Sequence, residues 1–340
     1  MAYRFLKSDA CAEGALRRIA CEQIDKALRA LDATGDDRAS AVHEVRKGCK
    51  KLRGLMRIVR PSFAAYSEEN AAFRDISRLL GAARDAKVLE QTYDAVLADY
   101  DGTLERSAFD PVRNALTRQR EEGTAEADLD ACFVEAREMM QAARARAEHW
   151  TLGGSGKGKR KDKDKDKDKD KDREEGREEG GQEGWQEGWD MLAPGIAATY
   201  RRARKTMARA AKKPNAERQH EWRKRVKYHL YHARLLRPIW PEQMEQRADL
   251  AKQLAELLGD HHDCHVLEET LAAPETYGSS EAVETMITLA RRRRASLEEQ
   301  AHRLGARLLA DKTGPLVDRW GEWWQAWISE GDLHQPALVR

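Results

Sequence analysis

Two short basic segments hold the residues whose types and spacing are best suited to chemistry. The first begins His43-Glu-Val-Arg46-Lys47-Gly-Cys-Lys50 and the second His220-Glu-Trp-Arg223-Lys224-Arg-Val-Lys227. Residues 42–60 contain seven Lys and Arg against one Glu, and residues 218–237 contain the same numbers. Guanidinium groups grip two oxygens at once and ammonium groups act as mobile point charges, so such rows suit a ligand with many negative charges.

The first segment has the periodicity of an amphipathic helix. At about 100° per residue, its cations fall within an arc of roughly 120°, and its apolar residues gather on the opposite side. Like charges four residues apart on one face destabilise a helix, and a multiply anionic ligand would relieve their repulsion. The alternative interpretation is a solvated charged face with histidines that only pack. Two such helices at matching positions favour the ligand over this alternative.

A second motif shows that the chain repeats itself. Leu79-Leu80-Gly81-Ala-Ala-Arg84-Asp85 matches Leu257-Leu258-Gly259-Asp-His-His262-Asp263, in the same order after the basic segment. Around both copies Ala, Leu, Arg, Glu and Lys dominate, without strand-like alternation. We therefore predict an all-α fold with two helical halves, 1–152 and 191–340. The Lys-Asp and Glu-Gly repeats of 153–190 predict a disordered linker.

In such a duplicated fold, the cationic faces of the two basic segments can face each other across one shared groove.

Composition excludes several classes of protein. The 340 residues carry 61 Lys+Arg and 59 Asp+Glu, and no apolar run is long enough to span a membrane. Five scattered cysteines favour a reducing, cytoplasmic compartment over a disulfide framework. Nucleophile-elbow, phosphate-loop and zinc-protease motifs are absent, so the interpretation is a binding protein that is not an enzyme and needs no cofactor.

Two further clusters have structural interpretations. His261 and His265 share a helix face at a spacing that can chelate a metal, but the first half lacks the pair and no third ligand is evident. Four tryptophans, Trp320, Trp323, Trp324 and Trp327, form a helical stripe that predicts core packing.

The two motifs together resemble the CHAD domain, the conserved histidine α-helical domain, over about residues 5–328. The resemblance implies two four-helix bundles related by pseudo-twofold symmetry, with a basic central cavity that binds inorganic polyphosphate. It also implies recruitment to polyphosphate granules in several members. Oligomeric state, preferred chain length and the role of the linker stay open.

Transferred to this chain, the resemblance and the repeat give a set of polyphosphate-binding residues. The first half contributes His43, Arg46, Lys47, Lys50, Lys51, Arg53, Arg57 and Arg84. The second half contributes Arg201, Arg204, Lys205, His220, Arg223, Lys224, Lys227, Arg234 and His262. The second half departs from the family pattern, because His229-Leu230-Tyr231 replaces the usual Leu-Arg-Tyr and His262 stands where the first half has Arg84.

Polyphosphate binding in the cytoplasm is thus the first functional interpretation. A metal-dependent polyphosphate hydrolase is the second, because Asp85 and Asp263 could hold a metal near phosphate. A nucleic-acid-binding helical protein with the same basic stripes is the third.

Overall fold

The structure, a computed structural model, describes residues 3–9, 11–33, 38–122, 126–153, 186–273, 277 and 280–330. These residues form α-helices joined by short 3₁₀ turns, and no strand occurs among them. The prediction of an all-α fold is confirmed. The turns are η1 (Lys7–Asp9), η3 (Arg60–Ser62), η4 (Arg106–Phe109) and η5 (Arg237–Ile239).

Four helices of the N-terminal half close a ring in which each helix contacts two others. They are α1 (Ala12–Ala30), α2 (Arg38–Ile58), α3 (Tyr66–Leu79) and α6 (Glu126–Ala147). Each turns an apolar stripe inward, which buries Ile19, Val45, Phe73 and Met140 completely. This ring is the first bundle.

The second bundle is formed by the C-terminal half. It contains α7 (Gln186–Lys212), α8 (Ala216–Leu235), α9 (Pro241–Leu271) and α11 (Glu281–Leu308), and α12 (Thr313–Ser329) packs on α7. Local sequence signals mark the helix starts. The Asn215 side chain accepts a hydrogen bond from the backbone N–H of Arg218 at 2.8 Å, and Pro241 occupies the first turn of α9.

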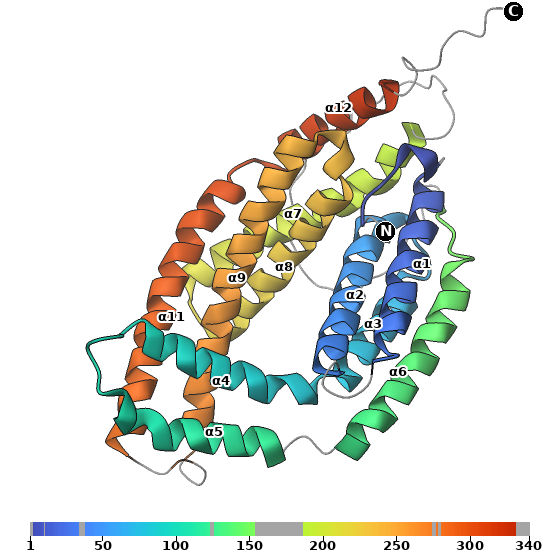
Figure 1. Cartoon of the computed structure of the whole chain (residues 1–340). Helices are drawn as coiled ribbons and strands as arrows, with labels where there is room; N and C mark the ends of the chain where they lie inside the picture. The colour runs from blue at the N-terminus through green and yellow to red at the C-terminus, as the bar shows by residue number, and fades with distance from the viewer. Residues whose placement is uncertain are drawn as a thin grey trace, which may run out of the picture.

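The two halves differ at the Leu-Gly motif. Helix α9 runs unbroken through Gly259, whereas α3 ends at Leu79 and α4 (Ala82–Ala98) begins after Gly81. Helix α4 and the following α5 (Asp110–Glu122) leave the first bundle and cross the lower ends of α9 and α11 (Figure 1). There Tyr93 and Val96 form a separate core with Leu267 and Met286.

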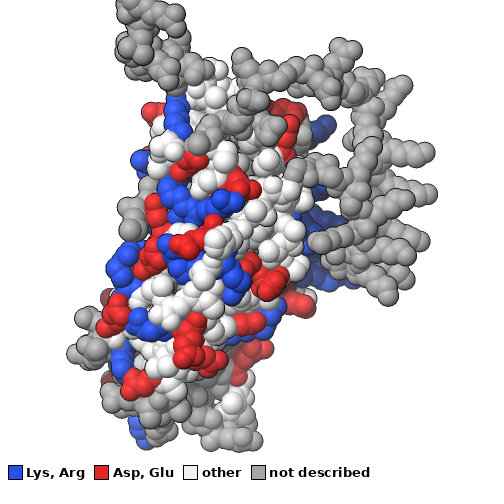
Figure 2. All heavy atoms as spheres, turned by 90° about the vertical axis from the view of Figure 1, so that its right-hand side faces the viewer, with Lys and Arg blue, Asp and Glu red and all other residues white. Residues whose placement is uncertain are grey.

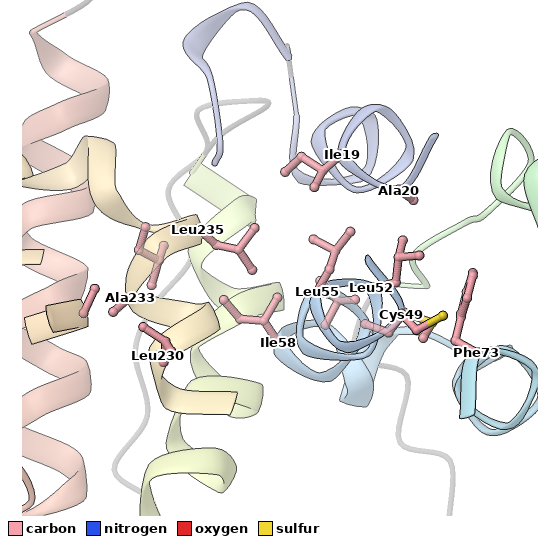
Figure 3. Close-up of a cluster of buried hydrophobic side chains, with 14 of the residues drawn as sticks. Ile19, Ala20, Cys49, Leu52, Leu55, Ile58, Phe73, Leu230, Ala233 and Leu235 are labelled. Atoms are coloured by element: carbon pink, nitrogen blue, oxygen red, sulfur yellow. The ribbon is translucent and has the colours of Figure 1, made fainter. Parts of the chain in front are cut away.

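The main hydrophobic core is continuous between the two bundles. Figure 3 shows Leu55 and Ile58 of α2 on one side and Leu230 and Leu235 of α8 on the other. The N-terminal segment also connects the two bundles, because the Phe5 N–H donates a hydrogen bond to the Leu235 carbonyl oxygen at 3.0 Å. The described residues of the two halves therefore share one core.

Most of the predicted linker, 154–185, lies outside the described residues. Its last five residues, 186–190, are helical and begin α7, so the helix starts earlier than expected. The reason is aromatic packing, since the Trp189 ring lies 5.8 Å from the ring of Trp324. The tryptophan stripe of α12 packs inward as predicted, with Trp320, Trp324 and Trp327 buried and Trp323 half-buried.

The face of the molecule that carries α1 and α6 has mixed charge. In Figure 2, Lys and Arg side chains alternate with Asp and Glu over this face. Arg144 Nε pairs with Asp25 Oδ1 at 2.8 Å, and Arg137 Nη2 pairs with Asp32 Oδ1 at 2.6 Å. This face therefore has the mixed charge of an ordinary solvated surface.

No helix in the described part of the chain is both long and apolar enough to cross a membrane. All five cysteines are free thiols, and burial raises the pKa of Cys49 to about 12 and that of Cys264 to about 11.

Candidate anion-binding cleft

Helices α2 and α8, which carry the two basic segments, cross at equivalent positions of the repeat. Gly54 lies against Tyr231, and a Cβ on Gly54 would lie 2.8 Å from the Cβ of Tyr231. One residue later, Nε2 of His232 contacts the Gly54 carbonyl oxygen at 3.2 Å. The absence of a side chain at position 54 thus lets the two backbones approach closely.

N-terminal to this crossing, the polar faces of both helices open onto one cleft with a volume of about 460 Å³. Its walls come from both halves of the chain. They comprise Arg46, Lys50 and Arg53 of α2, Val88 and Leu89 of α4, His220, Arg223, Lys224, Lys227, Tyr228 and Tyr231 of α8, and His262, Asp263 and Val266 of α9. We call this the first basic cleft, since six Lys and Arg residues line it against one carboxylate among the residues whose side chains the structure describes.

The Leu-Gly motif positions the first arginine of each basic segment. A Cβ on Gly81 would lie 3.1 Å from Nη1 of Arg46, and a Cβ on Gly259 would lie 2.6 Å from Nη2 of Arg223. Each guanidinium therefore lies directly on the backbone of the neighbouring helix, in the same way in both halves. In the first half, Arg46 Nη1 also donates to the Ser77 carbonyl oxygen at 2.8 Å.

The single acid of each basic segment holds the lysine three residues later. Glu44 pairs with Lys47 at 3.1 Å, and Glu221 pairs with Lys224 at 2.6 Å. Glu44 also accepts from Lys26, and hydrogen bonds from Lys26 and Lys47 lower the pKa of Glu44 to about 2. Each carboxylate therefore restricts the position of one lysine side chain of its basic segment, and its single negative charge cannot neutralise all the other cations of that segment.

The two motif histidines occupy different environments. His43 is exposed and is not among the residues that line the cleft. His220 is half-buried in the cleft wall, and its ring centroid lies 4.6 Å from that of His262. Burial, then the charge of Lys224, lowers the pKa of His220 to about 4, and burial also lowers the pKa of His262. Both imidazoles are neutral at pH 7.

Several predicted binding residues lie outside the first basic cleft. Lys51 and Arg234 line a separate depression with Tyr3 and Arg4, and burial, with Lys26 and Lys47 nearby, lowers the pKa of Lys51 to about 8. Arg57 lies beyond the crossing and stacks on Tyr228, with 4.1 Å from its Cζ to the ring centroid.

The remaining predicted residues are on α7, α2 and α4. Arg201 and Arg204 are on α7 and do not line the first cleft, and Lys205 lines a different cleft. Lys47, held by Glu44, is exposed and also lies outside the lining. The side chains of Arg84 and Asp85 lie outside the described residues.

Sequence reasoning did not find Tyr228, Tyr231, Val88 and Leu89 in the cleft wall. It also assigned no role to Gly81 and Gly259, although both belong to the repeated motif. The pairing of Gly54 with Tyr231 in the aligned repeats was the available signal for a helix crossing.

The described residues contain no group of three or more His, Cys, Asp and Glu side chains that could hold a metal ion. His261 faces Glu298, with 3.7 Å between Nε2 and Oε2, and His265 lies 3.3 Å from Glu269. The two histidines thus lie beside different carboxylates.

Comparison with known proteins identifies the family. Residues 18–272, more than half of the chain, match the CHAD domain. Among solved structures, PptA from Streptomyces chartreusis is similar, with 13% sequence identity, a TM-score of 0.54, and coverage of 87% of this chain and 98% of that chain. Curated proteins give no significant match. On the evidence of the family match, this chain belongs to the CHAD domain family.

Proposed function

We propose that this protein binds inorganic polyphosphate in the first basic cleft. The observation that carries the proposal is the shared wall, in which Arg46 and Lys50 of one repeat and Arg223 and Lys227 of the other line a single cavity. Membership of the CHAD domain family supports it, because resemblance to that family implies polyphosphate as ligand.

The chemistry of the cleft suits a linear polyanion. Polyphosphate has neither base nor sugar, so a binder needs cations and N–H donors at repeated intervals. Each charge-assisted hydrogen bond contributes about 1.5–3 kcal/mol, and several together exceed the cost of association. The neutral imidazoles of His220 and His262 can donate N–H groups to phosphate oxygens.

A binding experiment with long-chain polyphosphate tests the proposal. We expect saturable binding that weakens steeply with salt, with a slope of about −0.7 per neutralised phosphate in a double-logarithmic plot. Excess duplex DNA should not displace the ligand. A flat salt response, or full displacement by DNA, would refute the proposal.

The same mixture tests for catalysis. We propose that the protein binds polyphosphate without cleaving it, so the chain length should stay constant during incubation with Mg²⁺ or Mn²⁺. Shortening of the chains would instead support the hydrolase interpretation. As a consequence of binding, we propose a cytoplasmic location on polyphosphate granules, which a fluorescent fusion would reveal.

A further inference from the structure

A second basic cleft lies on the neighbouring side of α8. It has a volume of about 680 Å³ and is lined by the C-terminal half of α7, the turn into α8, the first turns of α8, and Arg60 of η3. In the described part of the chain, eight Lys and Arg residues and two carboxylates line it. This excess of cations differs from the mixed charge of the face formed by α1 and α6 (Figure 2).

The fold crowds these cations together. Burial, and then the positive charges of Arg225, Arg60 and Arg57, lower the pKa of Arg202. The arginines come from both halves of the chain. Arg57 on α2 and Arg60 in η3 belong to the N-terminal half, whereas Arg202 on α7 and Arg225 on α8 belong to the C-terminal half. A bound polyanion would offset their mutual repulsion.

A narrow ridge of α8 separates the two clefts. Glu221 lies on this ridge and pairs on one side with Lys224 of the first cleft, at 2.6 Å, and on the other with Arg225 of the second, at 3.3 Å. Arg57 also connects the clefts, since it stacks on Tyr228 of the first and acts electrostatically on Arg202 of the second. A linear polyanion therefore meets cations on both sides of the ridge.

The lining of the second cleft favours condensed phosphate over nucleic acid. None of the described residues that line it is aromatic, whereas single-stranded nucleic acid is held by stacking of its bases on aromatic rings. A concave pocket also cannot enter a groove of duplex DNA, which requires a protruding helix or ribbon. A cationic lining without aromatic rings on which bases could stack suits a chain made of phosphate alone.

We propose that the second basic cleft binds a further segment of the same polyphosphate chain after it passes over the α8 ridge. The inference rests on the proposed function and extends it, because two connected sites make affinity depend on chain length. A short phosphate oligomer fills one cleft, whereas a long chain fills both. Its second contact then benefits from the effective concentration that the first contact creates.

Charge-reversal variants in each cleft measure the contribution of that cleft to binding. The second-cleft variant is Arg209→Glu with Lys212→Glu, and the first-cleft variant is Lys50→Glu with Lys227→Glu. A matched control, Lys252→Glu with Arg303→Glu, makes the same charge change at exposed positions of α9 and α11 that line neither cleft. Glu, Lys and Arg have similar helix propensities, so all three should keep their helices, which circular dichroism checks.

Titration calorimetry with tripolyphosphate and with long-chain polyphosphate gives the readout. We expect the unmodified protein and the control to bind two tripolyphosphates per chain, and each cleft variant to bind one. The second-cleft variant should also lose about tenfold or more of its affinity for the long chain, since it loses the linked contact.

The contrary outcomes are distinct. If the second-cleft variant behaves as the control while the first-cleft variant loses all binding, the proposed function holds and the second site is refuted. If the second-cleft variant loses affinity only for single-stranded DNA, its ligand is nucleic acid and the inference is wrong. If the unmodified protein binds no polyphosphate, the proposed function itself fails.

Discussion

At the scale of single residues, the motif glycines explain how the arginines reach the cleft. Gly81 and Gly259 leave room for the guanidinium groups of Arg46 and Arg223 to lie on a neighbouring helix backbone. A guanidinium held in this way is oriented before the ligand arrives, which reduces the entropy lost on binding. The Leu-Gly motif thus contributes to binding by positioning the arginines of the basic segments, although its glycines have no charge.

This arrangement predicts the effect of Gly259→Ala. The new Cβ would lie 2.6 Å from Nη2 of Arg223, so the guanidinium must move away. We expect about a tenfold loss of polyphosphate affinity, the value of one charge-assisted hydrogen bond. Alanine is the better helix former, by up to about 1 kcal/mol, so the free energy of unfolding should not fall. Calorimetric titration and urea denaturation measure the two quantities.

Gly48→Ala is the matched control, because its new Cβ meets no atom closer than 3.7 Å. It should leave affinity unchanged. Equal affinities of the Gly259→Ala variant and the unmodified protein would show that Arg223 does not contact the ligand.

The sequence predicted part of this site. Arg46, Lys50, Arg223 and Lys227 were identified from charge and spacing, and the structure brings all four to one cleft. Lys51 belongs to the same basic segment but lies outside this cleft, because a helical wheel shows which side of a helix is polar but not which neighbour that side meets. His43 and His220 match in sequence, yet only His220 lies in the wall.

At the scale of helices, the crossing of α2 and α8 determines the extent of the shared cleft. Arg46, Lys50 and Arg53 before Gly54 line the common cavity, as do Arg223 and Lys227 before Tyr231. The equivalent pair Arg57 and Arg234, beyond the crossing, lies in different surroundings. The repeat in the sequence predicted two similar basic helices. It did not show where they cross, because that depends on side-chain volumes at one position of each helix.

Gly54→Ala tests the importance of this crossing. A Cβ at position 54 would approach Tyr231 at its Cβ and ring atoms within 3.0 Å, so a backbone must shift. Overpacking of this kind costs about 1–3 kcal/mol, and displacement of α8 should also weaken polyphosphate binding. Urea denaturation and calorimetry give both values. Gly48→Ala, on the same helix, should be neutral or slightly stabilising, and a neutral Gly54→Ala would mean that the crossing adjusts freely.

The break between α3 and α4 is a further difference between the two halves that the sequence did not predict. The Leu-Gly motif is present in both halves, but only the first half interrupts its helix there. The freed α4–α5 pair then buries Tyr93 and Val96 against α9 and α11. Motif similarity could not predict this break, since the residues that stabilise it lie in the other half of the chain.

At the scale of the whole molecule, buried histidines make folding sensitive to acid. Burial lowers the pKa of His232, which contacts the Gly54 carbonyl oxygen between the two bundles, to about 3. In the unfolded chain the pKa is near 6.5. As pH falls below that value, the unfolded state takes up protons that the folded state does not, so stability is present above pH 6.5 and is lost on acidification.

From pH 7 to pH 5 we expect the free energy of unfolding to fall by about 2 kcal/mol through His232 alone. Burial also lowers the pKa of His261, to about 4, so the total loss should be larger. Urea denaturation at both pH values measures it. His232→Gln cannot titrate, so its stability should depend less on pH than that of the unmodified protein. The same slope in both proteins would mean that His232 is not a source of the acid sensitivity.

The pairing of Gly54 with Tyr231 has a consequence for symmetry. In a twofold interface between identical subunits, only a residue that lies on the axis meets its own copy, so that position must pack against itself. Two tyrosines there would collide and two glycines would leave a void. When both repeats belong to one chain, the two positions can carry different residues, and a small one can face a large one. The covalent union of the repeats thus permits a small residue to pack against a large one at this crossing, which strict twofold symmetry forbids on the axis.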